Sequence, residues 1–207
     1  EYTSYDVIVV GAGINGVGIA LDAALRGLRV VLVEQDDICS GVSAWSGRLV
    51  HGGLRYLEHR DFGLVRESLV ERERLFQHAP HLVRPVPLLM PTFSHNRRPG
   101  WLIELGMVLY DTLSFGKTPP AHRYLRRDSV LRRFPGISPD GLKGSALFYD
   151  GQVELAERLC VEIALDAVAN GADLMLHTRV TAPIVTDGRV VGVRATRQRT
   201  GQTLELC

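Results

Sequence analysis

A glycine-rich loop between two elements of regular structure constrains this chain more than any other feature of its sequence. Residues 5–10 form an apolar run of the kind found in buried parallel strands. Residues 11–16, Gly-Ala-Gly-Ile-Asn-Gly, then match the pattern G-x-G-x-x-G. A pattern of small residues predicts a helix that ends near Gly27. Residues 28–33 predict a second buried strand, so the three segments make up a βαβ unit.

Each glycine of the loop has a predicted physical role. Gly11 permits the tight turn from strand to helix, and Gly13 leaves room where a pyrophosphate approaches the backbone. Gly16 lets the helix pack closely on the sheet. The helix N-terminus, which includes Ile14 and Asn15, offers free N–H groups and partial positive charge to phosphates.

An acid follows the second strand at a spacing that suits a ribose. Glu34 lies 18 residues after Gly16, near the spacing of about 20 expected for an acid that holds a ribose hydroxyl pair. Dinucleotide binding is predicted by this succession of strand, glycine loop, helix, strand and acid. Gln35, beside the acid, is included in the predicted site. The alternative is a glycine-rich turn with Glu34 in solvent.

The middle of the chain predicts a loop, a helix and a sheet edge. Gly and Ser enrichment over 36–53 predicts a loop with a short helix. Residues 62–78 predict an amphipathic helix, whose apolar face comprises Leu64, Val65, Leu69, Leu75 and Phe76. Four prolines over 80–91 favour an edge strand or an extended connection, because proline cannot donate to a sheet ladder.

Composition changes in the following segment. Residues 97–133 carry eight basic residues, Arg97 and Arg98 among them, against three acids. An apolar stretch, 101–113, lies inside this segment. We therefore expect an insertion into the dinucleotide fold.

The last third of the chain returns to alternating elements. We expect a strand over 146–149, a helix over 153–169 and a strand over 173–178. Two further strand segments follow, with turns at Asp187-Gly188 and Thr200-Gly201, which is typical of a β-meander.

A second motif surrounds paired glycines. His51-Gly52-Gly53-Leu54-Arg55-Tyr56 suits a loop whose backbone lies against a flat ring, while the Arg55 guanidinium points at an anion. The alternative is a helix N-terminus with an incidental His51 and a solvated Arg55.

Together these motifs resemble those of the FAD-dependent glycerol-3-phosphate dehydrogenases, in the D-amino-acid-oxidase-like flavoprotein superfamily. The resemblance is carried by residues 5–16, 48–58 and 79–85 (Ala-Pro-His-Leu-Val-Arg-Pro). The His-Gly-Gly-Leu-Arg-Tyr run favours this branch over sarcosine and amino-acid oxidases. Family enzymes are much longer, so the resemblance implies an N-terminal portion with an incomplete active site.

The resemblance implies an α/β fold: a Rossmann-like FAD-binding domain with a parallel central sheet and a β-meander, interrupted by an inserted part of a substrate domain. We expect the first part of the FAD-binding domain at 1–82 and the inserted substrate or cap segment at 83–144. The second part of the FAD-binding domain is expected at 145–207.

It also implies FAD as the cofactor. The glycine loop would hold the pyrophosphate and Glu34 the adenosine ribose. The following loop would line the diphosphate, residues 51–54 would pass beside the isoalloxazine ring, and Val180 would meet adenine through its backbone. The predicted cofactor-binding residues are Gly11, Gly13, Ile14, Asn15, Gly16, Glu34, Gln35, Ser43, Ser46, Arg48, His51, Gly52, Gly53, Leu54 and Val180. Arg55 and Tyr56 would face the substrate phosphate.

Three segments depart from the family pattern. Val42-Ser43-Ala44 stands where Thr-Ser-Ser is frequent, and Gly47-Arg48 where Ser-Lys is common. Glu154-Leu155-Ala156-Glu157 replaces Asp-Asp-Ala-Arg. The first two remove two hydroxyls and an ammonium from that loop, and no role is carried onto the helix at the third.

The implied activity is oxidation of sn-glycerol 3-phosphate to dihydroxyacetone phosphate, with electrons passed to a quinone or to oxygen. The sequence assigns no catalytic acid or base. One alternative is an oxidase of the same superfamily that acts on an amino acid or a 2-hydroxy acid, with Arg55 gripping a carboxylate. The other is a dinucleotide-binding module without catalysis.

Composition and residue spacing argue against several other kinds of partner. A net charge of +1 gives no strong attraction to nucleic acid. Three unevenly spaced cysteines predict no disulfide framework, and the histidines lack metal-ligand spacing, so we expect no metal. No stretch approaches the ~18 apolar residues of a membrane span. We expect a cytoplasmic protein, and the resemblance implies peripheral attachment to the inner face of the cytoplasmic membrane.

Overall fold

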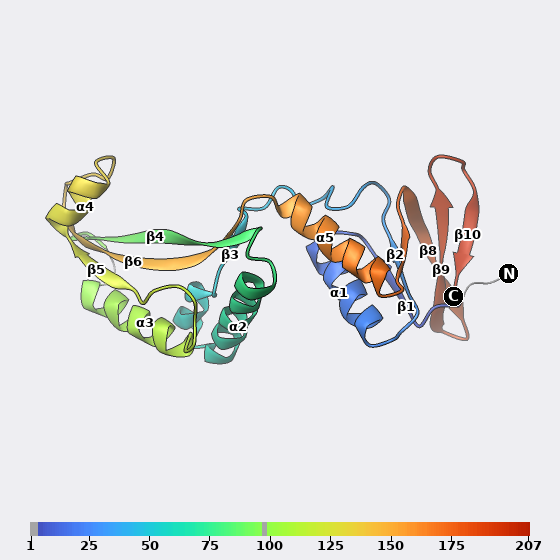
Figure 1. Cartoon of the computed structure of the whole chain (residues 1–207), viewed down its shortest axis with the longest axis horizontal. Coiled ribbons are helices and arrows are strands. Elements are labelled where there is room, and N and C mark those ends of the chain that lie inside the picture. The colour runs from blue at the N-terminus through green and yellow to red at the C-terminus, as the bar shows by residue number, and fades with distance from the viewer. Residues whose placement is uncertain (1–3, 97–98) are drawn as a thin grey trace. The chain divides into compact units, whose positions relative to one another are not determined.

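The computed structural model describes residues 4–96 and 99–207, which form two compact units (Figure 1). The first unit combines the chain up to Arg48 with Leu155–Cys207, and the second is Leu49–Glu154. The insertion expected at 83–144 lies inside the second unit, whose limits are wider. The reason is sheet pairing, because residues 49–50 and 83–93 both pair with the strand at 142–153.

A parallel sheet lies at the centre of the first unit. Its strands are β1 (Val7–Val10), β2 (Val30–Val33) and β7 (Asp173–Met175), in the order β1-β2-β7. Both pairings are parallel. Helix α1 (Ile14–Leu25) connects β1 to β2 and completes the βαβ unit that the sequence predicts. The predicted α/β class with a parallel sheet is confirmed.

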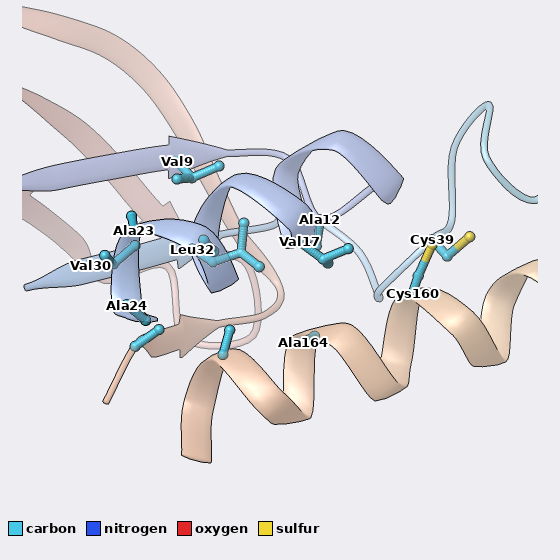
Figure 2. Packing of buried hydrophobic residues seen from close by; sticks show 13 residues of the cluster. Val9, Ala12, Val17, Ala23, Ala24, Val30, Leu32, Cys39, Cys160 and Ala164 are labelled. Atoms are coloured by element: carbon cyan, nitrogen blue, oxygen red, sulfur yellow. The ribbon is translucent and has the colours of Figure 1, made fainter. Parts of the chain in front are cut away.

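Strand β2 is buried on both faces. Val30 and Leu32 belong to the core that α1 and α5 (Ala156–Ala169) cover (Figure 2). Val31 and Val33 belong to a different cluster, with Leu206. Because successive side chains of a strand point to opposite faces, these are the two sides of the sheet. The continuous apolar run therefore reflects two cores rather than one.

Small side chains line the contact between α1 and α5. Ala20, Ala23 and Ala24 of α1 and Ala164 of α5 are almost fully buried. Cys39 and Cys160 lie next to each other at one end of this contact (Figure 2). Burial raises the pKa of the Cys160 thiol to about 12, and the neighbouring Cys39 adds to the shift. Cys160 therefore stays a neutral, apolar core group at physiological pH.

The β-meander is confirmed. It consists of β8 (Thr178–Thr186), β9 (Arg189–Arg197) and β10 (Thr203–Leu206), paired antiparallel in the order β10-β9-β8. The turn at Asp187 and Gly188 has φ values of 49° and 74°, as a tight hairpin turn between twisted strands requires.

The sheet of the second unit is antiparallel and built around β6 (Leu142–Val153). Strand β4 (Val83–Phe93) pairs with one side of β6, while β3 (Leu49–Val50) and β5 (Arg123–Arg126) pair with the other. Within the described residues β4 pairs with β6 alone, so the proline-rich segment is an edge strand, as predicted.

Helices cover this sheet. They are the 3-10 helix η1 (Leu54–His59), α2 (Phe62–His78), α3 (Gly100–Leu113) and α4 (Arg127–Arg133). One cluster joins α2, α3 and β6 through Val65, Leu69, Met107, Tyr110 and Phe148, among others. The Asp61 carboxylate caps α2 by accepting from the Leu64 amide at 3.1 Å. Helix α2 thus begins and ends where the sequence predicts.

A polar cluster ties the segment after α3 back onto this helix. The His122 ring contacts Asp111 at 2.7 Å through Nδ1 and Glu104 at 2.9 Å through Nε2. Lys117 also pairs with Asp111. Burial lowers the pKa of His122, but the hydrogen bonds to Asp111 and Glu104 outweigh it, so this pKa lies above its usual value.

Some sequence expectations were wrong. Leu64 is 38% exposed rather than in the core, whereas Arg72 is buried. Residues 35–46 form turns and bends instead of a short helix. The strand expected at 146–149 is the middle of β6, which runs to residue 153, so α5 begins at 156. Arg97 and Arg98 lie outside the described residues.

In the part of the chain that the structure describes, no helix combines the length and the apolar character needed to cross a membrane.

Candidate functional site

The glycine loop of the first unit is closed tightly on itself. Gly11 has a φ of 101°, which favours glycine, and its amide donates to the Val33 carbonyl at 2.8 Å. A Cβ on Gly16 would lie 1.8 Å from the Gly11 carbonyl oxygen. The third glycine is therefore required by the backbone of the loop itself, more than by helix–sheet packing as the sequence predicts.

Helix α1 begins without a side-chain cap of its own. Gly13 occupies the N-cap position in an extended conformation. The Ser43 hydroxyl, far along the chain, instead accepts from the Ile14 amide at 3.0 Å. A Cβ on Gly13 would lie 3.1 Å from that hydroxyl. The structure thus brings Ser43 to the glycine loop. Its hydroxyl oxygen accepts from one of the N–H groups with which a helix N-terminus can bind an anion.

Glu34 is buried at the end of β2, and the alternative of a solvated acid is wrong. One carboxylate oxygen accepts from the Ala12 amide at 2.8 Å, and the other accepts from the Asp36 amide at 2.9 Å. Only 8% of the residue is exposed. Each carboxylate oxygen has more than one lone pair, so both can still accept from a hydroxyl. Gln35, the next residue, is exposed.

These features fit a dinucleotide. The loop has no side chain at Gly13, where a diphosphate would approach, and the N-terminus of helix α1 begins at the next residue. A buried carboxylate with spare acceptor capacity is fixed to the same loop through Ala12. A pair of ribose hydroxyls is the kind of donor that suits such a carboxylate.

Arg48 lies at the end of the loop that follows β2, and its side chain is paired with helix α5. Its guanidinium pairs with Glu157 in the first turn of α5 at 2.6 Å. Its amide donates to the Ser46 hydroxyl at 3.3 Å, and its φ is 55°. Two residues that depart from the family pattern, Arg48 and Glu157, therefore contact each other. The sequence did not predict this pair.

Val180 lies on β8, the first strand of the meander. Its side chain is half-buried with Val31 and Val33, and its backbone is in register with Ala195. The side chain therefore serves the core.

The paired glycines of the second unit form a tight and crowded turn. Gly53 has a φ of 71°, and its amide donates to Nδ1 of His51 at 3.2 Å. A Cβ on Gly52 would lie 2.2 Å from the Tyr110 hydroxyl oxygen and 2.3 Å from Cδ2 of Leu69. Since Nδ1 of His51 accepts a hydrogen bond, the neutral ring carries its hydrogen on Nε2.

A cavity of about 470 Å³ opens beside this turn. The structure brings four predicted residues together in its lining, His51, Leu54, Arg55 and Tyr56. Gly52 and Gly53 are buried behind it. Two further lining residues, His59 and Asp150, were missed by sequence reasoning. The lining thus contains an arginine, two histidines and one acid.

A buried charge pair lies behind the cavity. Arg72 of α2 donates to the Asp150 carboxylate of β6, and their side chains are 1% and 4% exposed. Tyr110 of α3 donates its hydroxyl to the same carboxylate at 2.8 Å. Burial raises the pKa of the Tyr110 hydroxyl, and the Asp150 charge raises it further.

One sequence signal could have revealed this pair. Arg72 falls on the apolar face of α2, in register with Val65, Leu69 and Phe76. A basic residue on the apolar face of an amphipathic helix needs a buried partner. Asp150 directly follows the apolar run at 146–149, where an acid is equally out of place.

Within residues 4–96 and 99–207, no group of three or more histidine, cysteine or acidic side chains is arranged so that it could hold a metal ion.

Known proteins match this chain over almost its whole length. The family model of FAD dependent oxidoreductases (DAO) matches residues 6–205. A glycerol-3-phosphate dehydrogenase of Synechocystis sp. is 53% identical over 180 residues, which is 87% of this chain and 32% of that protein. A D-erythritol 1-phosphate dehydrogenase of Brucella abortus is 43% identical over 205 residues, 98% of this chain and 39% of the relative.

Among solved structures, the glycerol-3-phosphate dehydrogenase of Bacillus halodurans complexed with FAD is similar, with a TM-score of 0.72 and 29% identity. The match covers 99% of this chain and 32% of that one. The chain therefore spans about a third of the length of these glycerol-3-phosphate dehydrogenases.

Proposed function

Because the chain belongs to the DAO family of FAD-dependent oxidoreductases, we propose that it is part of an enzyme that oxidises sn-glycerol 3-phosphate to dihydroxyacetone phosphate. The observation that carries this proposal is the cavity in which Arg55 lies with His51 and His59. A volume of about 470 Å³ is ample for a small phosphorylated alcohol, and the Arg55 guanidinium in its lining suits a phosphate. The 53% identity to a glycerol-3-phosphate dehydrogenase supports the choice of substrate.

The first unit is proposed as the FAD-binding part. The glycine loop, from Gly11 to Gly16, would bind the diphosphate. Glu34 would accept from the adenosine ribose with the lone pairs that the Ala12 and Asp36 amides leave. Ser43, Ser46 and Arg48 would line the diphosphate, and the backbone at Val180 would contact adenine.

The second unit is proposed to carry substrate-binding residues. FAD, when bound, supplies the acceptor for the hydride equivalent that leaves C2 of the alcohol. The Arg55 guanidinium would bind the phosphate, with Tyr56 beside it. The family resemblance assigns residues 51–54 to the isoalloxazine ring. His51, with its hydrogen on Nε2, can donate to a substrate oxygen.

The electron acceptor and the location also belong to the proposal. We infer an acceptor such as a quinone, and peripheral contact with the inner face of the cytoplasmic membrane. Three exposed apolar side chains of α3 support contact with an apolar surface, Trp101, Leu105 and Val108. Co-sedimentation with lipid vesicles tests it, and protein that stays in the supernatant would contradict it.

A second candidate substrate is a longer polyol phosphate. The 43% identity to a D-erythritol 1-phosphate dehydrogenase favours it. It uses the same phosphate contact at Arg55, so only the remainder of the substrate differs.

A substrate panel on the full-length protein tests these proposals. Flavin absorbance is measured first, and dye reduction is then followed with glycerol 3-phosphate, erythritol phosphate, glycerol, amino acids and 2-hydroxy acids. We expect bound FAD and the fastest reduction with glycerol 3-phosphate. Reduction by an amino acid alone would favour an oxidase that grips a carboxylate, and a colourless protein would contradict the proposal.

A further inference from the structure

One carboxylate oxygen in the second unit receives three donors from three different segments. Oδ1 of Asp150, on β6, accepts from the Gly52 amide at 3.0 Å and from the Tyr110 hydroxyl at 2.8 Å. The Arg72 guanidinium of α2 donates to the same atom and also to the Tyr149 carbonyl, at 3.1 Å. Asp150 therefore links a turn, two helices and a strand.

Folding stability alone does not account for this buried charge pair. Burying both members of an ion pair is often no better than burying apolar groups of the same size. Nε of Arg72 is, in addition, a buried donor without a partner among the described residues. A more specific consequence is that the charge pair presents an anchored acceptor to one backbone amide, that of Gly52.

The same groups also restrict the turn sterically. The Tyr110 hydroxyl and Leu69 fill the space where a side chain at position 52 would lie. The Gly52 backbone is thus held by a hydrogen bond to Asp150 and by contact with Tyr110. Gly53 in turn holds the ring of His51 through Nδ1.

We propose that Asp150 is a positioning residue of the substrate site, oriented by Arg72 and Tyr110, and that it fixes the turn at residues 51–54. The proposal rests on the function proposed above. Asp150 lines the cavity beside His51 and Arg55, so a shift of the turn changes the geometry of both. A displacement of about 1 Å in such a shell can lower turnover by roughly a hundredfold.

The test compares two tyrosines, of which Tyr110 donates its hydroxyl to Asp150. Tyr110→Phe removes the hydroxyl that donates to Asp150. Tyr149→Phe removes a hydroxyl from the neighbouring position of β6, where only the backbone carbonyl contacts Arg72. The chemical change is identical, so Tyr149→Phe is the matched control.

Two readouts are made on the full-length flavoprotein. Without substrate, we expect hydrogen exchange at residues 50–56 to be about tenfold faster in Tyr110→Phe, and unchanged over α2. With substrate, we expect kcat to fall about tenfold, while KM changes less than about threefold because Arg55 is intact. The Tyr149→Phe protein should match the wild type in both.

A second pair of variants covers the charge. Asp150→Asn keeps an oxygen for the Gly52 amide but leaves the Arg72 charge uncompensated. If it does not fold, Arg72→Met combined with Asp150→Asn removes both charges and keeps that oxygen. We expect the double variant to recover soluble protein with bound flavin, and to retain at least about a tenth of wild-type kcat because the introduced amide oxygen still anchors the turn.

Two results would overturn the proposal. One is an unchanged exchange rate at 50–56 in Tyr110→Phe, and the other is faster exchange spread equally over α2 and α3. The failure of the proposed function is distinguishable, because a wild-type protein that oxidises no polyol phosphate still reports on the turn through exchange.

Discussion

At the scale of single residues, Gly16 and Gly18 both lie on α1, but only one has room for a side chain. A Cβ on Gly16 would lie 1.8 Å from the Gly11 carbonyl oxygen, whereas a Cβ on Gly18 would have no neighbour within 4 Å. Gly16→Ala must therefore shift the loop that is proposed to bind the diphosphate. Gly18→Ala should do no harm and gain the ~1 kcal/mol that alanine offers inside a helix.

We expect Gly16→Ala to lose bound flavin and Gly18→Ala to keep it. Flavin absorbance per protein, measured beside far-ultraviolet dichroism, checks both. Full flavin content in a folded Gly16→Ala protein would contradict the diphosphate assignment of the loop.

Arg55 offers a prediction about the substrate phosphate. Arg55→Lys keeps the charge but cannot reproduce a bidentate contact, and a charge-assisted hydrogen bond is worth ~1.5–3 kcal/mol. We expect KM for glycerol 3-phosphate to rise at least about tenfold, and activity on unphosphorylated glycerol to change little. Steady-state kinetics on both substrates check it. An unchanged KM with intact flavin would remove Arg55 from the phosphate site.

At the scale of elements, hydrophobic periodicity predicted a helix that buries one apolar face. It failed to predict element limits that depend on pairing between two segments distant in the sequence. The helix at 62–78 follows from its apolar spacing, and its cap is Asp61. The start of α5 was wrong because residues 150–153 complete β6, whose limits depend on pairing with β4. Sequence reasoning also missed Asp150 at the cavity, because its role arises from a tertiary contact with Arg72, 78 residues away in the sequence.

The contact between His122 and α3 predicts a pH dependence. The folded-state pKa of His122 is raised above 6.5, so its contribution to stability is fully present below pH 6.5 and is lost as pH rises through the folded value. We expect the Tm of the second unit to fall over that range. His122→Gln should flatten the change.

Thermal unfolding monitored at several pH values, with both proteins in the same buffers, checks this. On the acid side the contribution of Asp111 is lost as pH falls, because hydrogen bonds from Lys117 and His122 outweigh burial and lower its pKa. Identical pH profiles for wild type and His122→Gln would show that another group is responsible.

At the scale of the whole molecule, the two units differ in how the chain builds them. The second unit is one continuous segment, Leu49–Glu154. The first unit is built from two segments, one before and one after the second unit in the sequence. The sequence predicted an interruption of the dinucleotide fold. Its limits could not be predicted, because the short strand β3 is defined only by pairing with β6.

The pairing of β2 with β7 has a consequence for the order of folding. Val31 and Asp173 are partners in the sheet, so on a ribosome that edge of β2 has no partner until the inserted unit has emerged. The continuous unit can fold first, whereas the discontinuous one must wait and close a long loop. In pulse-labelling during refolding, amide protection should appear in β4 and β6 before it appears between β2 and β7. The reverse order would mean that the parallel sheet nucleates folding, with the insertion as a loop that condenses later.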